Sequence, residues 1–252
     1  MTDLVALQRM NAQRWANARS TRNFASIAKR LASPDAQSRY QAVSTTTGAP
    51  WPLIAVIHER ECSQDWTRSL AQGDPWDRVS VHVPAGRGPF KSWEDAAVDA
   101  LNNCAPYAGR NKDWSIGALL TKLEEYNGLG YAARGVPSPY LWAGTDQYRS
   151  GKYVRDGVYD PNVIDSQAGC AGLLMAMKAL DPAITFTGAT HATLAPKAPA
   201  SPIGLAPAPS LKNPARGSIG AWIVSMLSAI SNRKENRCFT CSPSHFSFSL
   251  CS

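Results

Sequence analysis

The sequence predicts a mainly α-helical protein with one small β-hairpin. Two patterns in its 252 residues support this fold class. Apolar residues recur at intervals of three and four in several segments, as on the buried face of a helix. Alternating apolar and polar residues, which are typical of a strand, are clear only at Val79, Val81 and Val83. No run of 18 apolar residues occurs, so we expect no membrane-spanning helix.

Apolar spacing and helix-boundary residues together define the expected helices. Ser92, with Asp95 three residues later, resembles a capping box at the start of one helix. Asp160 followed by Pro161 has the form of an N-cap and a proline at the first helical position. The expected helices cover 4–18, 24–31 and 34–43, begin at 51 and at 92, cover 115–126, and run from 160 to about 180.

Two segments break the helical pattern. In "GDPWDRVSVHVPAGRGPF" (73–90), the alternating valines are followed by glycine and proline, which predicts a small β-hairpin or an extended loop. The segment 126–153 is too irregular for a helix and too rich in aromatic residues for a plain linker.

Composition along the chain suggests four regions. N-terminal helices at 1–40 are expected to pack on a core domain at 41–186, where we place the function. Residues 187–215 form a linker rich in proline and alanine. The segment 216–252 is short, apolar and basic, and we expect its last residues to be disordered.

Charge is unevenly distributed along the chain. The net charge is +7, but residues 41–182 carry 13 basic against 16 acidic residues. A slightly acidic body with basic ends is not typical of a nucleic-acid groove, so we expect no nucleic-acid partner. Basic ends favour an anionic surface such as a membrane or a cell wall. The segment 216–234 predicts peripheral membrane contact, with docking on the body or self-pairing as the alternatives.

The cysteines give little support for a metal site. Cys62, Cys104 and Cys170 stand alone in apolar surroundings and are expected to be buried thiols. "CFTC" (238–241) is a single CxxC with only His245 nearby, whereas structural zinc needs four ligands. We therefore predict no metal and no cofactor.

The stretch "IAVIHERECSQDW" ends an apolar helix on two glutamates. At 100° per residue, Ile57 and His58 share a face with Glu61, whereas Glu59 points about 160° away from Glu61. A carboxyl at the edge of an apolar face is partly desolvated, which favours the protonated form that a general acid needs. The alternative is a structural glutamate paired with Arg60 or His58.

Three blocks of sequence resemble a family of bacterial and phage lysozyme-like proteins related to goose-type lysozymes and lytic transglycosylases. The blocks are "AVIHERECSQDW", "LAQGDPWDRVSVHVPAGRGPF" and "LEEYNGLGYAARGVPSPYLWAGTDQYRSGKYVRDGVYDP", in that order. The resemblance covers about 40–180 and implies a lysozyme-like α+β fold. Glu61-Cys62 is similar to the Glu-Ser signature of the general acid, with Cys62 in place of serine. "YNG" at 126–128 is similar to the Tyr-Asn-Ala-Gly motif of the sugar groove.

The resemblance implies cleavage of the peptidoglycan glycan strand between N-acetylmuramic acid and N-acetylglucosamine. Glu61 would protonate the leaving oxygen, and either water assisted by Asp74 or the muramic 6-hydroxyl would attack. We predict glycan contacts at His82, Tyr126, Asn127, Tyr131, Tyr140, Trp142 and Tyr148. Several of these loop aromatics are expected to be exposed, whereas Trp15, Trp51 and Trp93 are expected in the core.

Two other functions stay open at this stage. One is a non-catalytic cell-wall-binding or phage structural protein on a lysozyme scaffold. The other is a chitinase-type enzyme with Glu59 as the acid, because His58-Glu59 resembles a chitinase signature, although the Gly-Gly that should follow is missing. We expect a monomer made in the cytoplasm without a signal peptide and acting at the cell wall or periplasm, with the export route open.

Overall fold

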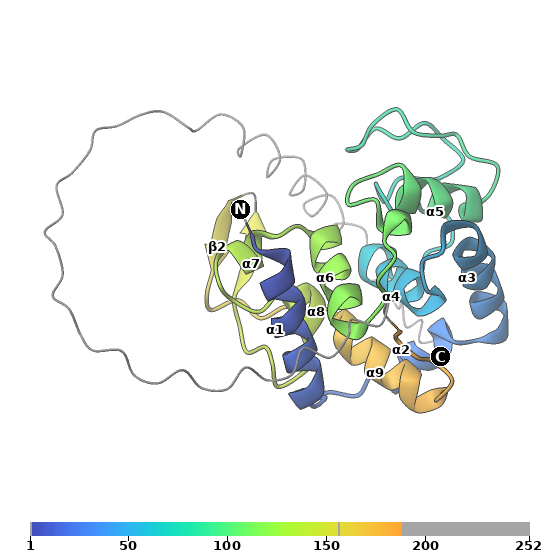
Figure 1. Cartoon of the computed structure of the whole chain (residues 1–252). Coiled ribbons are helices and arrows are strands. Elements are labelled where there is room, and N and C mark those ends of the chain that lie inside the picture. The colour runs from blue at the N-terminus through green and yellow to red at the C-terminus, as the bar shows by residue number, and fades with distance from the viewer. Residues whose placement is uncertain (1, 156, 188–252) are drawn as a thin grey trace, which may run out of the picture.

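The computed structural model describes residues 2–155 and 157–187, and this part of the chain is mainly helical, as predicted (Figure 1). The elements in chain order are α1 (Leu4–Asn17), α2 (Ala25–Leu31), α3 (Pro34–Thr47), α4 (Trp51–Cys62), α5 (Trp93–Asn102), the 3-10 turn η1 (Ala108–Arg110), α6 (Ile116–Asn127), α7 (Gly130–Ala133), α8 (Pro139–Trp142), β1 (Lys152–Arg155), β2 (Val158–Asp160) and α9 (Cys170–Leu180).

Helix boundaries follow local side-chain chemistry. The Asp3 carboxylate accepts hydrogen bonds from two backbone amides of the first turn of α1, both at 3.0 Å. The predicted cap at Ser92 is confirmed, because its hydroxyl accepts from the Asp95 amide at 3.1 Å. Gly48, with φ of 73°, ends α3 in the left-handed conformation that glycine adopts without steric cost.

The predicted hairpin at 73–90 is an extended loop, which was the second of the two alternatives. Val79, Val81 and Val83 are all exposed, so their alternation does not mark a buried sheet face. The loop closes on itself instead, with the Ser80 amide donating to the Arg87 carbonyl at 2.8 Å. Alternation without a partner strand to cover one face is insufficient to form a sheet.

The strands of the described residues lie at the C-terminal end of the irregular segment 126–153 and just beyond it. β1 and β2 pair antiparallel, with Tyr153 opposite Tyr159. The rings of Tyr131 and Tyr153 pack edge to face, with centroids 5.0 Å apart. The helix predicted from Asp160 is wrong over its first turns, because Asp160 ends β2 and α9 begins only at Cys170.

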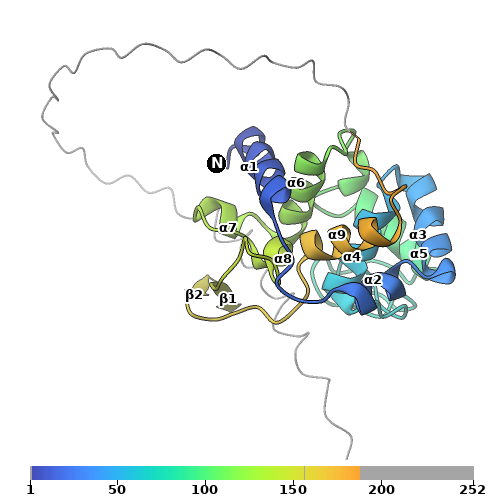
Figure 2. The same cartoon turned by 90° about the horizontal axis from the view of Figure 1, so that it is seen from below.

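α4 is the central helix of the described body. Every residue from Pro52 to His58 is buried, so α4 is apolar all round rather than on one face. It contacts α2, α3, α6 and α9. Figures 1 and 2 show α3 and α5 to one side of α4, and α1, α7 and β2 to the other. The end of α4, which carries the two candidate glutamates, is therefore supported by both halves of the body.

The N-terminal helices belong to the same core. α1 packs on α6, and α2 packs on α9. Phe24, Leu31 and Tyr40 are all buried members of the main hydrophobic cluster. The predicted segment 216–252, and the predicted linker apart from its first residue, lie outside the described residues.

The contact between α2 and α9 predicts that Gly172→Ala is destabilising. A Cβ at Gly172 would lie 2.3 Å from the tip of the Phe24 ring. Alanine normally favours a helix over glycine, but this overlap should cost about 1–3 kcal/mol of unfolding free energy. Urea unfolding followed by circular dichroism measures the change.

The matched control places the same substitution in a Phe24→Leu background. The shorter side chain removes the ring atoms that meet the new Cβ, so the additional loss should be clearly smaller there. A Gly172→Ala protein more stable than the parent chain would contradict the close approach of α2 and α9.

Candidate active site

The candidate site lies at the C-terminal end of α4, where the chain turns sharply. Ser63 and Gln64 have φ of 54° and 59°, which is left-handed backbone and ends the helix. The Gln64 amide group fixes this turn by donating to the Tyr40 hydroxyl at 3.0 Å and accepting from Arg30 at 2.6 Å. Glu61 lies half-buried in the last turn of α4, just before this bend.

Glu59 is held on another side of the same turn. Its carboxylate forms an ion pair with the Arg30 guanidinium at 2.8 Å, and its side chain is only 11% exposed. This agrees with the expectation that Glu59 and Glu61 face different surroundings. That expectation assumed that α4 has a single apolar face. The assumption is wrong, because α4 is buried all round up to His58. The Glu59 side chain contacts Arg30 instead of pointing into solvent.

Arg60, between the two glutamates, is buried and points into the body. Its guanidinium forms an ion pair with Asp165 and lies over the Tyr140 ring, 5.1 Å from the ring centroid. It also donates to the Ala168 carbonyl at 3.4 Å. Arg60 therefore ties the last turn of α4 to the segment before α9 and to α8.

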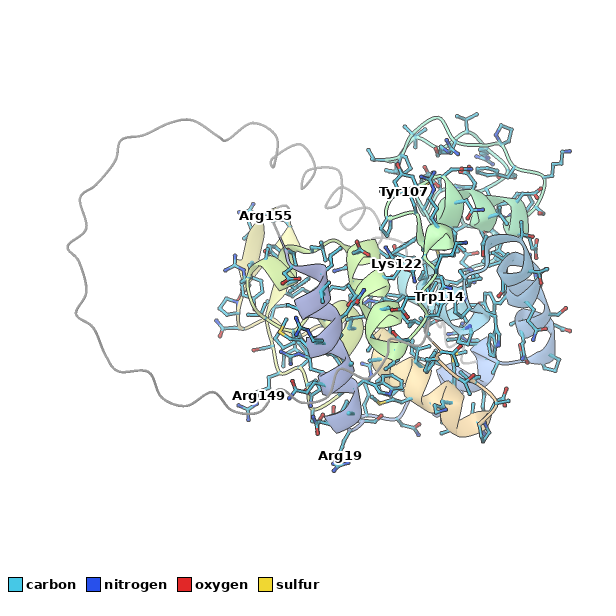
Figure 3. All side chains as sticks on the ribbon, in the orientation of Figure 1. Arg19, Tyr107, Trp114, Lys122, Arg149 and Arg155 are labelled. Carbon is cyan, nitrogen blue, oxygen red and sulfur yellow. The ribbon has the colours of Figure 1, made fainter. Side chains whose placement is uncertain are left out.

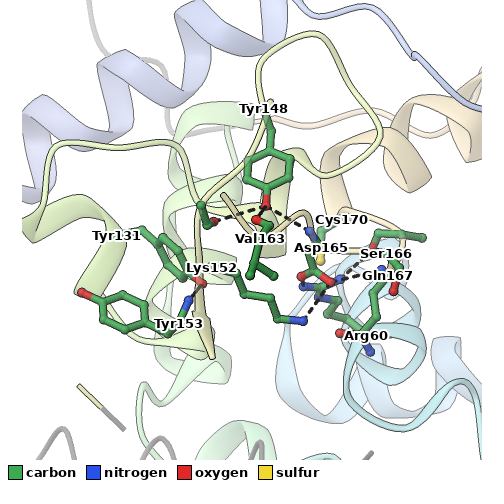
Figure 4. A network of polar contacts seen from close by, with 12 residues as sticks. Arg60, Tyr131, Tyr148, Lys152, Tyr153, Val163, Asp165, Ser166, Gln167 and Cys170 are labelled. Carbon is green, nitrogen blue, oxygen red and sulfur yellow. Dashed lines mark hydrogen bonds and ion pairs between the residues drawn. The ribbon is translucent and has the colours of Figure 1, made fainter. Parts of the chain in front are cut away.

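Asp165 is the centre of a polar network that joins four segments (Figure 4). Arg60 from α4 and Lys152 from β1 share its carboxylate, with the Lys152 ammonium at 3.2 Å. The Asp165 amide donates to the Tyr148 hydroxyl at 3.1 Å, and that hydroxyl donates to the Gly151 carbonyl at 3.2 Å. Burial alone would raise the pKa of Asp165, but the two cations hold it below its ordinary value.

Sequence reasoning missed the role of Asp165. It placed Asp165 inside a helix that in fact begins at Cys170, and it considered Arg60 as a partner of Glu61. The only available signal was an arginine at the end of an apolar helix, which requires a buried counter-charge. No spacing rule relates Arg60 to a partner 105 residues away.

Asp74 holds its own loop in place. One carboxylate oxygen accepts from the amides of Val81 and His82, both at 2.9 Å, and the other lies 2.5 Å from the His82 ring. Burial by itself would raise the pKa of Asp74. The hydrogen bonds from His82 and Val81 have the larger combined effect, so the pKa lies below its ordinary value. The geometry matches a capping carboxylate and brings together Asp74 and His82, two of the predicted site residues.

Tyr126 and Asn127 end α6 as buried residues. The Tyr126 hydroxyl donates to the Leu70 carbonyl at 3.0 Å, which ties α6 to the segment after α4. Asn127 is 7% exposed and precedes Gly128, whose φ is 99°. The predicted motif therefore lies at a helix end that is fixed against the α4 region.

The prediction of an exposed aromatic groove in 126–153 is wrong. None of the predicted aromatic contact residues is more than 8% exposed: Tyr126, Tyr131, Tyr140, Trp142 and Tyr148. The segment folds into the core because α8 packs against α6 and α9, and because the Tyr131 and Tyr148 hydroxyls accept hydrogen bonds from the backbone amides of Tyr153 and Asp165. Trp93 is in the core as expected, whereas Trp15 and Trp51 are half-buried at its edge.

His58 lies in an aromatic cluster on the α3 side of α4. Its ring is 4.6 Å from Trp66 and 4.7 Å from Trp93, centroid to centroid. The Asp65 carbonyl accepts from Nε2 at 3.1 Å, so Nδ1 must accept from the Tyr40 hydroxyl at 3.0 Å. Burial lowers the pKa of His58 to about 4, which keeps the ring neutral near pH 7.

A separate cavity of about 70 Å³ lies between α1, α6 and the segment before α8. The buried Glu124 and Asn11 line it, and the Asn11 amide donates to the Glu124 carboxyl at 3.2 Å. Burial raises the pKa of Glu124. Glu61 does not line this cavity, so the cavity is distinct from the candidate site.

The described residues, 2–155 and 157–187, contain neither a cluster of metal ligands nor a membrane-spanning helix. Within these residues no group of three or more His, Cys, Asp or Glu gathers as a metal site would require. No helix there has the length and apolar character needed to cross a bilayer. Cys104 and Cys170 are buried as expected, and Cys62 is half-buried. The "CFTC" motif lies outside this part of the chain.

Comparisons of the chain with protein-family models, with curated proteins and with solved structures found no match. The mainly helical class is established by the structure. The lysozyme-like topology and its activity stay predictions.

We expect the stability of the protein to fall between about pH 6.5 and pH 4 because of His58. In this window the unfolded chain binds a proton at residue 58 and the folded chain does not, so lowering the pH favours unfolding. A pKa of about 4 against an ordinary value of 6.5 corresponds to about 3 kcal/mol at the lower end. Urea unfolding at about pH 7 and about pH 4.5 measures the difference.

His58→Asn should lose most of this pH dependence, even if its stability is lower throughout. Equal pH dependence in the parent chain and His58→Asn would contradict a neutral, buried His58.

We expect Asp165→Asn to be strongly destabilising. The change leaves the buried Arg60 charge without its counter-ion, which typically costs about 3–5 kcal/mol. Asp77→Asn is the control, because Asp77 is exposed and should change the unfolding free energy by less than about 0.5 kcal/mol. Replacing both members of the pair, Arg60→Met with Asp165→Leu, should recover part of the loss. Equal stability of Asp165→Asn and Asp77→Asn would show that the network is not needed for the fold.

Proposed function

We propose that this protein is a glycosidase that cleaves the peptidoglycan strand between N-acetylmuramic acid and N-acetylglucosamine, with Glu61 as the general acid. The observation that carries the proposal is the placement of Glu61. It is a half-buried carboxyl in the last turn of a buried central helix, and this helix contacts α6, which ends on the Tyr126-Asn127 of the "YNG" segment. Its two chain neighbours on the N-terminal side, Glu59 and Arg60, are each held by an ion pair. A backbone fixed in this way keeps a catalytic side chain in one position.

In the proposed reaction, Glu61 gives its proton to the glycosidic oxygen as the bond to C1 breaks. The resulting carboxylate then takes a proton from the nucleophile that attacks C1. Asp74 is bound by two amides and a histidine, which speaks against a role as the base for water. This supports attack by the muramic 6-hydroxyl, which gives a 1,6-anhydro sugar and needs no second carboxylate.

The charge of the chain supports a polyanionic cell-wall substrate. The net charge of +7 is carried by the two ends of the chain, and within the described body Arg19, Arg149 and Arg155 are exposed and project outward (Figure 3). Carboxylates on peptide stems and anionic wall polymers would be attracted to such a surface at low ionic strength. We propose that the protein acts on this material as a monomer.

A chitinase-type reaction through Glu59 has less support. The Glu59 carboxylate is held against α2 by an ion pair with the Arg30 guanidinium at 2.8 Å, rather than presented to a substrate. No particular contact favours a non-catalytic wall-binding role, and an assay of fragment release from sacculi distinguishes that role from catalysis.

Glu61→Gln should keep the fold and lose at least about two orders of magnitude in cleavage rate, as expected when a general acid is removed. Release of soluble fragments from purified sacculi measures the rate, and mass spectrometry of their ends identifies the product. An anhydro end is lighter by one water than a hydrolysed end. Glu59→Gln is the matched control and should lose much less activity.

Three results would change the proposal. If Glu59→Gln is inactive and Glu61→Gln is active, the chitinase-type assignment is correct instead. If the parent chain binds sacculi and releases no fragments, the protein is a binding scaffold. If reducing ends appear without anhydro ends, the enzyme is a hydrolase.

A further inference from the structure

The cavity between α1, α6 and the segment before α8 has a polar floor. Three side chains that line it are almost fully buried, since Asn11 and Glu124 are 2% exposed and Ser138 is 1% exposed. The Asn11 amide group donates to the Thr121 hydroxyl at 3.1 Å and to the Glu124 carboxyl at 3.2 Å. Buried carboxylates are usually paired with a cation, but Glu124 forms no ion pair with any described residue.

The hydroxyl of Ser138 is a second group in this cavity that lacks a partner. It is buried, and no donor or acceptor among the described residues reaches it. An unsatisfied buried hydroxyl is destabilising and uncommon in folded proteins. Alanine would fill nearly the same space without that cost. Ser138 and Glu124 therefore both have hydrogen-bonding capacity to offer to a molecule that enters the cavity.

Arg14 marks the mouth of the cavity. Two residues of the lining, Met10 and Gly135, are exposed, and Arg14 is half-buried, so the cavity leads from the surface to the polar floor. Arg14 lies three residues after Asn11 and so on the same face of α1. Its guanidinium forms no ion pair with Glu124 or with any other described residue. Opposite charges thus line one cavity without being joined.

The size and the walls of the cavity suit a small organic molecule better than water. Its volume is about 70 Å³, and one water needs about 10–15 Å³ by this measure, so there is room for about five non-hydrogen atoms. Water would neutralise neither charge, and an ordered water needs two to four polar partners. The walls are instead apolar and comprise Leu7, Met10, Val136, Pro137 and Trp142.

We propose that this cavity binds a small zwitterionic amino acid, with its ammonium group on Glu124 and Ser138 and its carboxylate on Arg14. An ammonium has three donors, for which the Glu124 carboxylate and the Ser138 oxygen are acceptors. A guanidinium pairs well with a carboxylate. A plain amine would be repelled by Arg14, and a plain carboxylate by Glu124. The site is separate from Glu61, and the inference does not depend on the proposed glycosidase activity.

Calorimetric titration of the full chain with glycine and with alanine tests the inference. Methylammonium and acetate are the matched ligands, because each carries one of the two charges. Glycine or alanine should bind at least about tenfold more tightly than either single-charge ligand. The melting temperature should rise by roughly 5–10 °C when the amino acid is present at about 100 times its Kd.

Three substitutions locate the binding site. Glu124→Gln keeps an acceptor for Asn11 but removes the charge, and it should weaken amino-acid binding by at least about tenfold. Ser138→Ala should keep or raise the melting temperature of the free protein and weaken binding by about tenfold. Arg14→Gln should lower the affinity for glycine to that for methylammonium.

Glu125→Gln is the matched control for Glu124→Gln. Glu125 is the next residue of α6, pairs with Lys122 at 2.5 Å and does not line the cavity. Its substitution should leave the affinity for glycine and alanine unchanged. The same titration in Glu61→Gln should also match the parent chain, because binding is measured without turnover.

No binding of glycine or alanine by the parent chain would overturn the inference and leave a cavity that holds only water. Methylammonium binding as tightly as glycine would overturn the assignment of a zwitterion. Parent-like affinity in both Glu124→Gln and Ser138→Ala would place any binding elsewhere on the molecule. If Glu124→Gln fails to fold, Ser138→Ala and Arg14→Gln decide the question. Absence of cleavage of sacculi bears on Glu61 alone and leaves these outcomes unchanged.

Discussion

The ion pair between Arg60 and Asp165 is the contact on which the candidate site depends. It joins the last turn of the central helix to the segment before α9, and through Lys152 it also holds β1. A buried pair of this kind contributes little net stability compared with apolar packing, but breaking it leaves a buried charge. It therefore acts as a strict geometric constraint, and it sets the position of the helix end that carries Glu61.

Because Arg60 is fixed by this ion pair, the directions of its neighbours Glu59 and Glu61 on the helix are fixed as well. Successive residues of a helix point about 100° apart, so the three side chains reach three different environments. Glu59 forms an ion pair with Arg30, and Arg60 forms an ion pair with Asp165. Glu61 follows in the last turn of α4 and is half-buried. Two acidic residues two positions apart thereby lie in different surroundings.

The aromatic residues of 126–153 are mainly structural, because most of them are buried in the core. Tyr131, Tyr148 and Tyr153 hold β1 and the segment before α9 through ring contacts and hydroxyl bonds. Any sugar contact by this region must therefore come from its edges rather than from exposed ring faces.

The sequence by itself determined the mainly helical class, most helix boundaries and the separation of Glu59 from Glu61. These features depend on local periodicity and capping, which act within a few residues. The tertiary structure decided where the strands lie, which aromatics are buried and how Asp74 is used. Each of these depends on a partner distant in sequence. Asp165 is the extreme case, because only the folded chain brings it to Arg60, and local sequence carries no information about a contact made across the core.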